Sequence, residues 1–136
     1  MKFVLPLTIV AVMLSGLFVS SLANAEAKSD TQASYVSLDP PFVVNVTGAT
    51  GNHFLQIAAQ VKITDPSVAD TLKQSQAPIR DAMIMLFSGQ KVDYLKTIAG
   101  KETLRKQALA AIQKVLKDNT GKPGVDGLYF TGFVIQ

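Results

Sequence analysis

The sequence predicts an α+β fold in which helices pack on one face of a small antiparallel sheet. Apolar and polar residues alternate strictly over residues 53–64, which is the spacing of a strand with one buried face. The spacing changes to about 3.6 residues over residues 78–116, which is the period of amphipathic helices. Aromatic and β-branched residues return over residues 125–136 and indicate a closing strand. The expected order of elements is β-β-α-α-α-β.

Two strands open the predicted domain and are expected to form an antiparallel hairpin. Residues 35–38 are a short extended piece, and Asp39-Pro40-Pro41 then interrupts any regular ladder because two prolines remove two N–H donors. The first clear strand covers residues 42–46, and a glycine-containing loop leads from it into the strand of residues 53–64. The apolar face of this second strand consists of Leu55, Ile57, Ala59, Val61 and Ile63.

Two helices are expected directly after these strands. Asp65 can accept hydrogen bonds from the free N–H groups of the first helix, and Pro66 suits its first position. Pro78 is expected to end this helix and to begin the next one. Ser88-Gly89 is expected to close the second helix, whose apolar residues are Ile79, Ala82, Met83, Leu86 and Phe87.

A third and longer helix is expected over residues 99–118, after a brief turn at residues 92–95. Thr97 is its predicted N-cap, and its end is predicted from Asn119, Gly121 and Pro123. The helix needs a sheet or another helix to cover its apolar stripe. That stripe consists of Leu104, Ala108, Ala111, Ile112 and Val115. Glu102 precedes Arg105 and Lys106 by one helical turn, which predicts weak ion pairs.

The closing strand of residues 125–136 carries apolar side chains on both faces. Tyr129, Phe133 and Ile135 share one parity, whereas Leu128, Phe130 and Val134 share the other. Such a pattern favours a central or well-covered strand. Gly132 marks a bulge or a close approach by another backbone.

The N-terminal residues 1–25 have two interpretations, a membrane anchor or a cleaved signal peptide. Lys2 is followed by twenty uncharged residues, from Phe3 to Leu22, which just reach the length that spans a bilayer. Ala23-Asn24-Ala25 has the form of a signal-peptidase site, and the residues alone favour cleavage at Ala25. Residues 26–34 are small and polar and predict a flexible linker. Both interpretations place the domain of residues 35–136 outside the cytoplasm.

Composition excludes several kinds of site. The 136 residues contain no cysteine and a single histidine, His53, which excludes disulfides, thiolate metal sites and multi-histidine metal sites within one chain. The formal net charge is +3, and no block of five like charges occurs. This distribution lacks the basic stripe of a nucleic-acid-binding protein, so we expect no nucleic-acid partner.

No residues combine into a catalytic, cofactor-binding or metal-binding motif. His53 opens a strand with no carboxylate nearby in sequence, so we interpret it as a strand-end histidine. Asp65, Asp70 and Asp81 lie near expected helix starts, where carboxylates stabilise the helix dipole. Gly48 and Gly51 are too weak a pattern for a phosphate loop. The sequence therefore predicts a protein that is not an enzyme and that uses no cofactor.

Arg80-Asp81 has a structural and a functional interpretation. The first is an ion pair on the helix surface, which the residue types favour. The second is a contact with another subunit or a partner protein. Both interpretations stay open at the level of the sequence.

Four segments, in order, resemble one protein family. They are YVSLDPPFVVN at residues 35–45, PIRDA at residues 78–82, IAGKETLR at residues 98–105 and VDGLYFTGFVIQ at residues 125–136. With these segments, the domain resembles the periplasmic domain of FliL, the flagellar basal-body-associated protein family. The resemblance covers residues 35–136, and it implies a fold similar to that of stomatin- and prohibitin-type domains, which assemble into rings.

The resemblance also implies a function and partners. FliL-like proteins associate with the flagellar stator and basal body and support motor rotation, swimming and swarming. The family normally keeps its N-terminal helix in the inner membrane, so the resemblance favours retention of Phe3 to Leu22 as a single-pass anchor, with the C-terminal domain in the periplasm. A homo-oligomeric ring is the expected assembly. The alternative is a soluble periplasmic binding or scaffold module that is not involved in motility.

Overall fold

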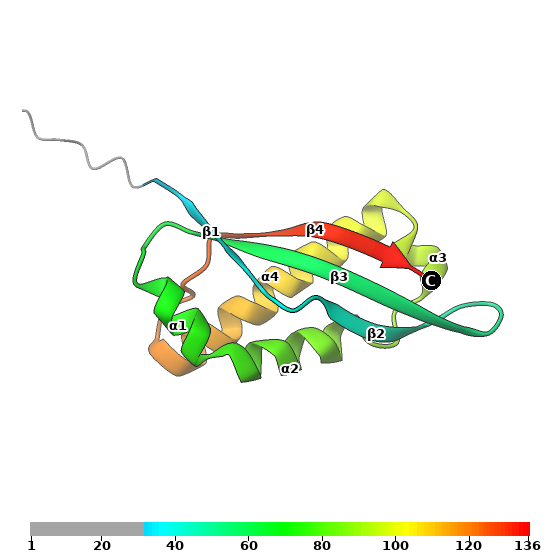
Figure 1. Ribbon diagram of the computed structural model, residues 1–136, viewed down its shortest axis with the longest axis horizontal. Coiled ribbons are helices and arrows are strands. Elements are labelled where there is room, and N and C mark those ends of the chain that lie inside the picture. Colours follow the sequence, from blue (N-terminus) through cyan, green and yellow to red (C-terminus); the bar gives the residue numbers. More distant parts are fainter. Residues whose placement is uncertain (1–31) are drawn as a thin grey trace, which may run out of the picture.

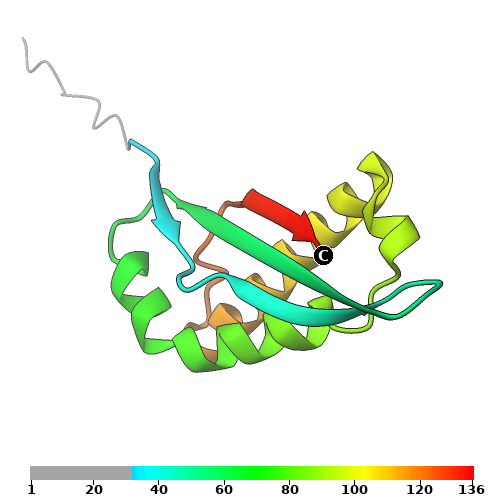
Figure 2. The same ribbon diagram turned by 45° about the vertical axis from the view of Figure 1, so that its right-hand side comes forward.

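A four-stranded sheet lies against one layer of helices in this computed structural model, which describes residues 32–136 (Figure 1). Figure 2 shows the helices on one side of the sheet. The α+β class, the antiparallel sheet and the helical layer are confirmed. The elements, in order, are β1 (Ser34–Ser37), β2 (Phe42–Thr47), β3 (Asn52–Ile63), α1 (Val68–Gln74), α2 (Gln76–Phe87), α3 (Val92–Leu95), α4 (Ile98–Thr120) and β4 (Gly127–Ile135).

Two short elements add to the predicted order. The extended piece at residues 35–38 belongs to β1, which pairs with the end of β3 from Ser34 opposite Ile63 to Ser37 opposite Gln60. The expected turn at residues 92–95 is the helical turn α3, whose Val92 and Leu95 are buried. Both elements are ordered by tertiary partners, which local sequence patterns do not reveal.

Strand β3 is the centre of the sheet. It pairs antiparallel with β2, β1 and β4, and the predicted β2–β3 hairpin is confirmed. Because β4 faces the same stretch of β3 as β1 and β2 together, these two short strands share the opposite edge. Pro40 and Pro41 separate them, as expected from their missing N–H donors. The five predicted core residues of β3 are all buried: Leu55, Ile57, Ala59, Val61 and Ile63.

A bulge in β4 explains why this strand is apolar in both parities. Ala59 lies opposite Phe130 and Ala58 opposite Gly132, so Thr131 has no partner and the side-chain alternation shifts by one residue. The helix-facing side chains are therefore Leu128 and Phe130 before the bulge, and Phe133 and Ile135 after it. The bulge expected at Gly132 is confirmed. Of the two predicted alternatives, a central or a well-covered strand, the central position is wrong, because β4 pairs with β3 alone among the described strands.

The boundary between the first two helices differs from the prediction. Ser75 separates α1 from α2, three residues before Pro78, and Pro78 lies inside the first turn of α2. A proline is tolerated there because the first N–H groups of a helix have no intrahelical acceptor. The helical hydrogen bonds of α2, from an N–H to the carbonyl four residues earlier, begin with the bond from the Ile79 N–H to the Ser75 carbonyl, at 3.0 Å. Asp65 does accept from the Ser67 N–H at 2.9 Å, although α1 itself starts at Val68.

The long helix α4 has the predicted caps. The Thr97 hydroxyl accepts a hydrogen bond from the Gly100 N–H at 2.9 Å and donates one to the Tyr94 carbonyl at 2.7 Å. Gly100 permits this tight entry, since a Cβ atom there would lie 2.0 Å from the Tyr94 oxygen. Gly121 ends the helix at a φ of 80°, a left-handed conformation that favours glycine.

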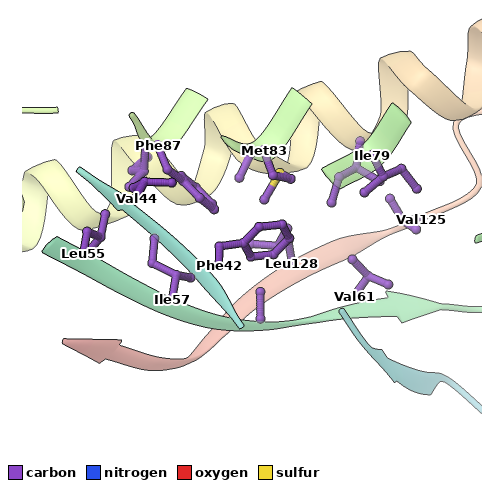
Figure 3. Packing of buried hydrophobic residues seen from close by; sticks show 14 of the residues in the cluster. Phe42, Val44, Leu55, Ile57, Val61, Ile79, Met83, Phe87, Val125 and Leu128 are labelled. Carbon is purple, nitrogen blue, oxygen red and sulfur yellow. The ribbon is translucent and has the colours of Figure 1, made fainter. Parts of the chain in front are cut away.

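The core lies between the sheet and helices α2 and α4 (Figure 3). Phe42 and Phe87 contact each other edge to face there, with ring centroids 5.5 Å apart. Helix α4 contributes Leu104, Ala108, Ile112 and Leu116, none of which exposes more than 1 % of its surface.

Within residues 32–136, no helix is both long enough and apolar enough to cross a membrane. The predicted segment from Phe3 to Leu22 lies outside the described residues, as does most of the predicted linker.

A charge placed in this core should destabilise the fold. We expect Ile112→Asp to lower the free energy of unfolding by about 3–5 kcal/mol, because an unpaired charge would be buried between α4 and the sheet. The matched variant Gln107→Asp, on the exposed side of the same helix, should change it by no more than about 0.5 kcal/mol. Urea denaturation followed by circular dichroism measures both. Equal effects would show that Ile112 does not lie in a core.

Candidate interaction site

His53 is a strand-end residue, as expected. Its Nε2 donates to the Thr50 carbonyl at 2.7 Å, within the loop that joins β2 to β3. Its ring lies against Gly48, where a Cβ atom would come within 2.3 Å of the ring. This contact, rather than phosphate binding, explains a glycine at residue 48.

The carboxylates that the sequence singled out lie apart from one another. Asp65 lies just before α1, and hydrogen bonds from the Ser67 hydroxyl and N–H lower the pKa of its carboxyl. Asp70 lies 3.9 Å from Lys73 on the exposed face of α1, and Asp81 is exposed on α2. In the part of the chain that the structure describes, no three histidine or carboxylate side chains come together as a metal site.

Arg80 fastens the connection between β1 and β2 to helix α2. Its Nη1 donates to the Pro40 carbonyl at 2.8 Å, and its guanidinium lies 4.4 Å from the centroid of the Phe42 ring. Gln76, one turn earlier, donates to the Asp39 carbonyl at 3.2 Å. Helix α2 thus binds the backbone of Asp39 and Pro40, the two residues at which the chain passes from β1 to β2.

The predicted ion pair between Arg80 and Asp81 does not form among the described residues. Neighbouring residues of a helix point in directions about 100° apart, so the side chains do not face each other. Arg80 turns toward the sheet, whereas Asp81 stays exposed on the surface of α2. The functional interpretation of Asp81 as a contact with another chain stays a prediction.

Arg105 makes the corresponding contact between α4 and β4. Its Nη1 donates to the Leu128 carbonyl at 3.1 Å. Its Nη2 and Nε donate to the two carboxylate oxygens of Glu102 at 2.6 and 2.8 Å, which confirms the predicted pair. These bonds lower the pKa of the Glu102 carboxyl and raise the pKa of Arg105. Lys106 lies 3.8 Å from the same carboxylate.

The two arginines bring together, in pairs, the four segments singled out in the sequence. Arg80 joins residues 78–82 to residues 35–45, and Arg105 joins residues 98–105 to residues 125–136. Spacing along the chain identified the Glu102–Arg105 pair but not the two bonds to backbone carbonyls. The signal in the sequence for a bond from an arginine to a backbone carbonyl is its place next to a buried residue of an amphipathic helix, as Arg80 is to Ile79 and Arg105 is to Leu104.

A shallow groove runs beside the Arg105 contact. Its volume is about 290 Å³, and it is lined by Ile98, Lys101, Glu102, Arg105, Tyr129 and Phe130. The Lys101 ammonium lies 5.3 Å from the centroid of the Phe133 ring. Ile98 exposes 88 % of its surface at the start of α4. The groove therefore combines an apolar rim with positive charge next to the outer strand of the sheet.

Comparison with known proteins gives two matches. Residues 35–136 match the family described as flagellar basal body-associated protein FliL. The chain is also similar to the flagellar protein FliL of Aquifex aeolicus (strain VF5), with 31 % identity over 99 residues. This alignment covers 73 % of the present chain and 59 % of the relative, so the chain spans less than two thirds of the relative's length. The family match covers all four segments that the two arginines join.

The Arg80 contact should stabilise the fold, and Asp81 should not. We expect Arg80→Ala to lower the free energy of unfolding by about 1–3 kcal/mol, because it removes a charged donor from the Pro40 carbonyl and a cation from the Phe42 ring. Asp81→Ala, at the next residue, should change stability by no more than about 0.5 kcal/mol. Thermal and urea denaturation of the two variants measure the difference. Equal losses would mean that the Arg80 contact does not hold the β1–β2 connection.

Proposed function

This chain belongs to the FliL family of flagellar basal body-associated proteins, and from this membership we propose that it is a non-catalytic accessory of the flagellar motor. In this role it associates with the basal body and the stator and supports motor rotation, swimming and swarming. The observation that carries the proposal is the family match over residues 35–136, which is nearly all of the described domain.

A contact role agrees with the kind of surface the domain offers. Several large apolar side chains are exposed on it, including Met85 at 72 %, Val43 at 62 % and Ile98 at 88 %. Exposed apolar groups distributed over strands and helices suit contacts with other proteins. Asp81 on α2 is a candidate member of such a contact, because it is exposed and the fold gives it no ion pair among the described residues.

The proposed location is the inner membrane, with the domain of residues 35–136 in the periplasm and the segment from Phe3 to Leu22 as a single anchor. Residues 26–34 then form a short tether, which confines the domain near the bilayer. Confinement raises the effective concentration of neighbouring copies and of stator subunits in the same membrane. Weak contacts between domains can then support a homo-oligomeric ring, the assembly that we propose.

The anchor can be tested by the mass of the native protein. We expect protein purified from membranes to keep residues 1–25, since twenty uncharged residues suffice to cross the bilayer. Intact-mass spectrometry shows whether residues 1–25 are retained, and fractionation by osmotic shock shows whether the protein stays with the membrane. A mature N-terminus at Glu26, with the protein released by osmotic shock, would establish cleavage after Ala25 and refute the anchor.

The motor role can be tested by motility. We expect deletion of the gene to reduce swimming or swarming, with the larger effect under high load. We expect Asp81→Arg to reduce swarming while the melting temperature of the domain stays unchanged, because a reversed charge at an exposed contact weakens assembly without exposing core. Asp70→Arg makes the same change of charge on α1 and serves as the control.

Two outcomes would contradict this proposal. Normal swimming and swarming after deletion, across a range of loads, would remove the motor role and leave the soluble periplasmic binding module as the function. A defect of equal size in the Asp70→Arg control would show that charge in general, rather than a contact at Asp81, affects motility.

A further inference from the structure

The two outer edges of the sheet differ in how they are covered. The outer edge of β2 is occupied by the segment after α2, because Gly89 N–H donates to the Asn45 carbonyl at 3.1 Å and Thr47 N–H donates to the Gln90 carbonyl at 2.8 Å. Strand β4 pairs with β3 on one side only, and no other backbone segment within residues 32–136 pairs with its outer side. In Figure 1, β4 forms the upper border of the sheet along its whole length.

The outer edge of β4 carries unpaired backbone groups. Phe54 and Gln136 exchange two backbone hydrogen bonds, at 2.8 and 2.9 Å. Since hydrogen-bonding direction alternates along an antiparallel strand, Ile135 and Phe133 direct their N–H and C=O groups away from β3. The Leu128 carbonyl points outward as well, but it already accepts a hydrogen bond from Arg105.

The sequence of β4 lacks the side chains that usually protect such an edge. Edge strands commonly carry charged residues or proline, which prevent another strand from pairing with them. The nine residues GLYFTGFVI contain neither, and they are rich in aromatic and β-branched residues. The bulge at Thr131 and the Arg105 bond to the Leu128 carbonyl protect part of this edge, whereas the outward groups of Phe133 and Ile135, after the bulge, have no backbone partner among the described residues. This edge is therefore well suited to receive an added strand.

The charge beside this edge indicates what kind of strand it receives. The groove next to β4 contains two cations, Lys101 and Arg105, and one carboxylate, that of Glu102. Arg105 neutralises that carboxylate, whereas no carboxylate of residues 32–136 lies within ion-pair distance of Lys101. Acidic side chains on the α4-facing side of an incoming strand would meet Lys101, which lies one helical turn from the exposed Ile98 in the same groove.

We propose that the outer edge of β4 is a docking site for an extended, acidic segment of a partner protein, which adds a strand to the sheet beside Lys101. This inference rests on the proposed function and specifies the chemistry of one partner segment. Backbone hydrogen bonds to β4 provide affinity, and the groove between β4 and α4 selects the charge. A second copy of this chain is a poorer occupant, since antiparallel pairing of two β4 strands would bring both sets of Lys101 and Arg105 onto the same face of the joined sheet.

Peptide binding to the full-length protein in detergent tests this site. The probe is a fluorescein-labelled peptide of about ten residues in which glutamate and valine alternate, long enough to cover β4. The control probe replaces each glutamate with lysine. We expect fluorescence anisotropy to show saturable binding of the glutamate peptide, weakened by added salt, and at least about tenfold weaker binding of the lysine peptide.

Two lysine variants test the place of binding. Lys101→Glu should raise the dissociation constant of the glutamate peptide about tenfold, because attraction becomes repulsion at the groove. Lys117→Glu, which makes the same change at an exposed residue near the other end of α4, should leave the constant within about twofold. In addition, the peptide should slow hydrogen exchange of the outward-facing amides of Phe133 and Ile135, which a peptide on the sheet face would not do.

Each other outcome would overturn the proposal. Equal binding of the two peptides would remove the selection for acidic segments. Equal weakening by both variants would mean that net charge, rather than the groove, attracts the peptide. Absence of binding, with amides of β4 that become protected as protein concentration rises, would assign the edge to a second copy. None of these results depends on motility, so they are separate from a failure of the motor role.

Discussion

The apolar face of β3 is the constraint on which the rest of the structure depends. Its five buried side chains need a cover, which α2 and α4 provide, and its two edges provide hydrogen-bonding partners for the other three strands. The short strands β1 and β2 cannot form a sheet alone, because each has only β3 as a neighbour of regular length. A shift of β3 by one residue in its pairing register would turn its apolar side chains to the solvent face, and the sheet would then no longer pack against the helices.

Two arginines connect this sheet to the helices at its borders. Arg80 and Arg105 both donate to backbone carbonyls of the sheet layer, at Pro40 and Leu128, and both remain partly exposed. A carbonyl at the end or edge of a strand has no neighbouring N–H, so a long cationic side chain from a helix can satisfy it. Conversely, each arginine is fixed by that bond and is less available for contacts with another molecule than its charge suggests.

The remaining surface divides into protected and unprotected parts. The segment after α2 covers the outer edge of β2, whereas the outer edge of β4 is uncharged and bordered by Lys101 and Ile98. Proteins that act by contact commonly keep such an edge open, since an added strand brings many hydrogen bonds without a deep pocket. This asymmetry between the two edges is the basis for placing the proposed docking site at β4 rather than at β2.

The sequence by itself determined the class of fold, the half-buried strand β3, the long helix α4 with Thr97 and Gly121 at its ends, and the family. These features depend on residues close together in the chain, where periodicity and capping act directly. Only the tertiary structure decided that β1 is a strand, that Ser75 divides α1 from α2, and that β4 lies at an edge with its alternation shifted at Thr131. It also decided that Arg80 binds Pro40 rather than Asp81. Each of these outcomes depends on a partner far away in sequence, whose position no local pattern specifies.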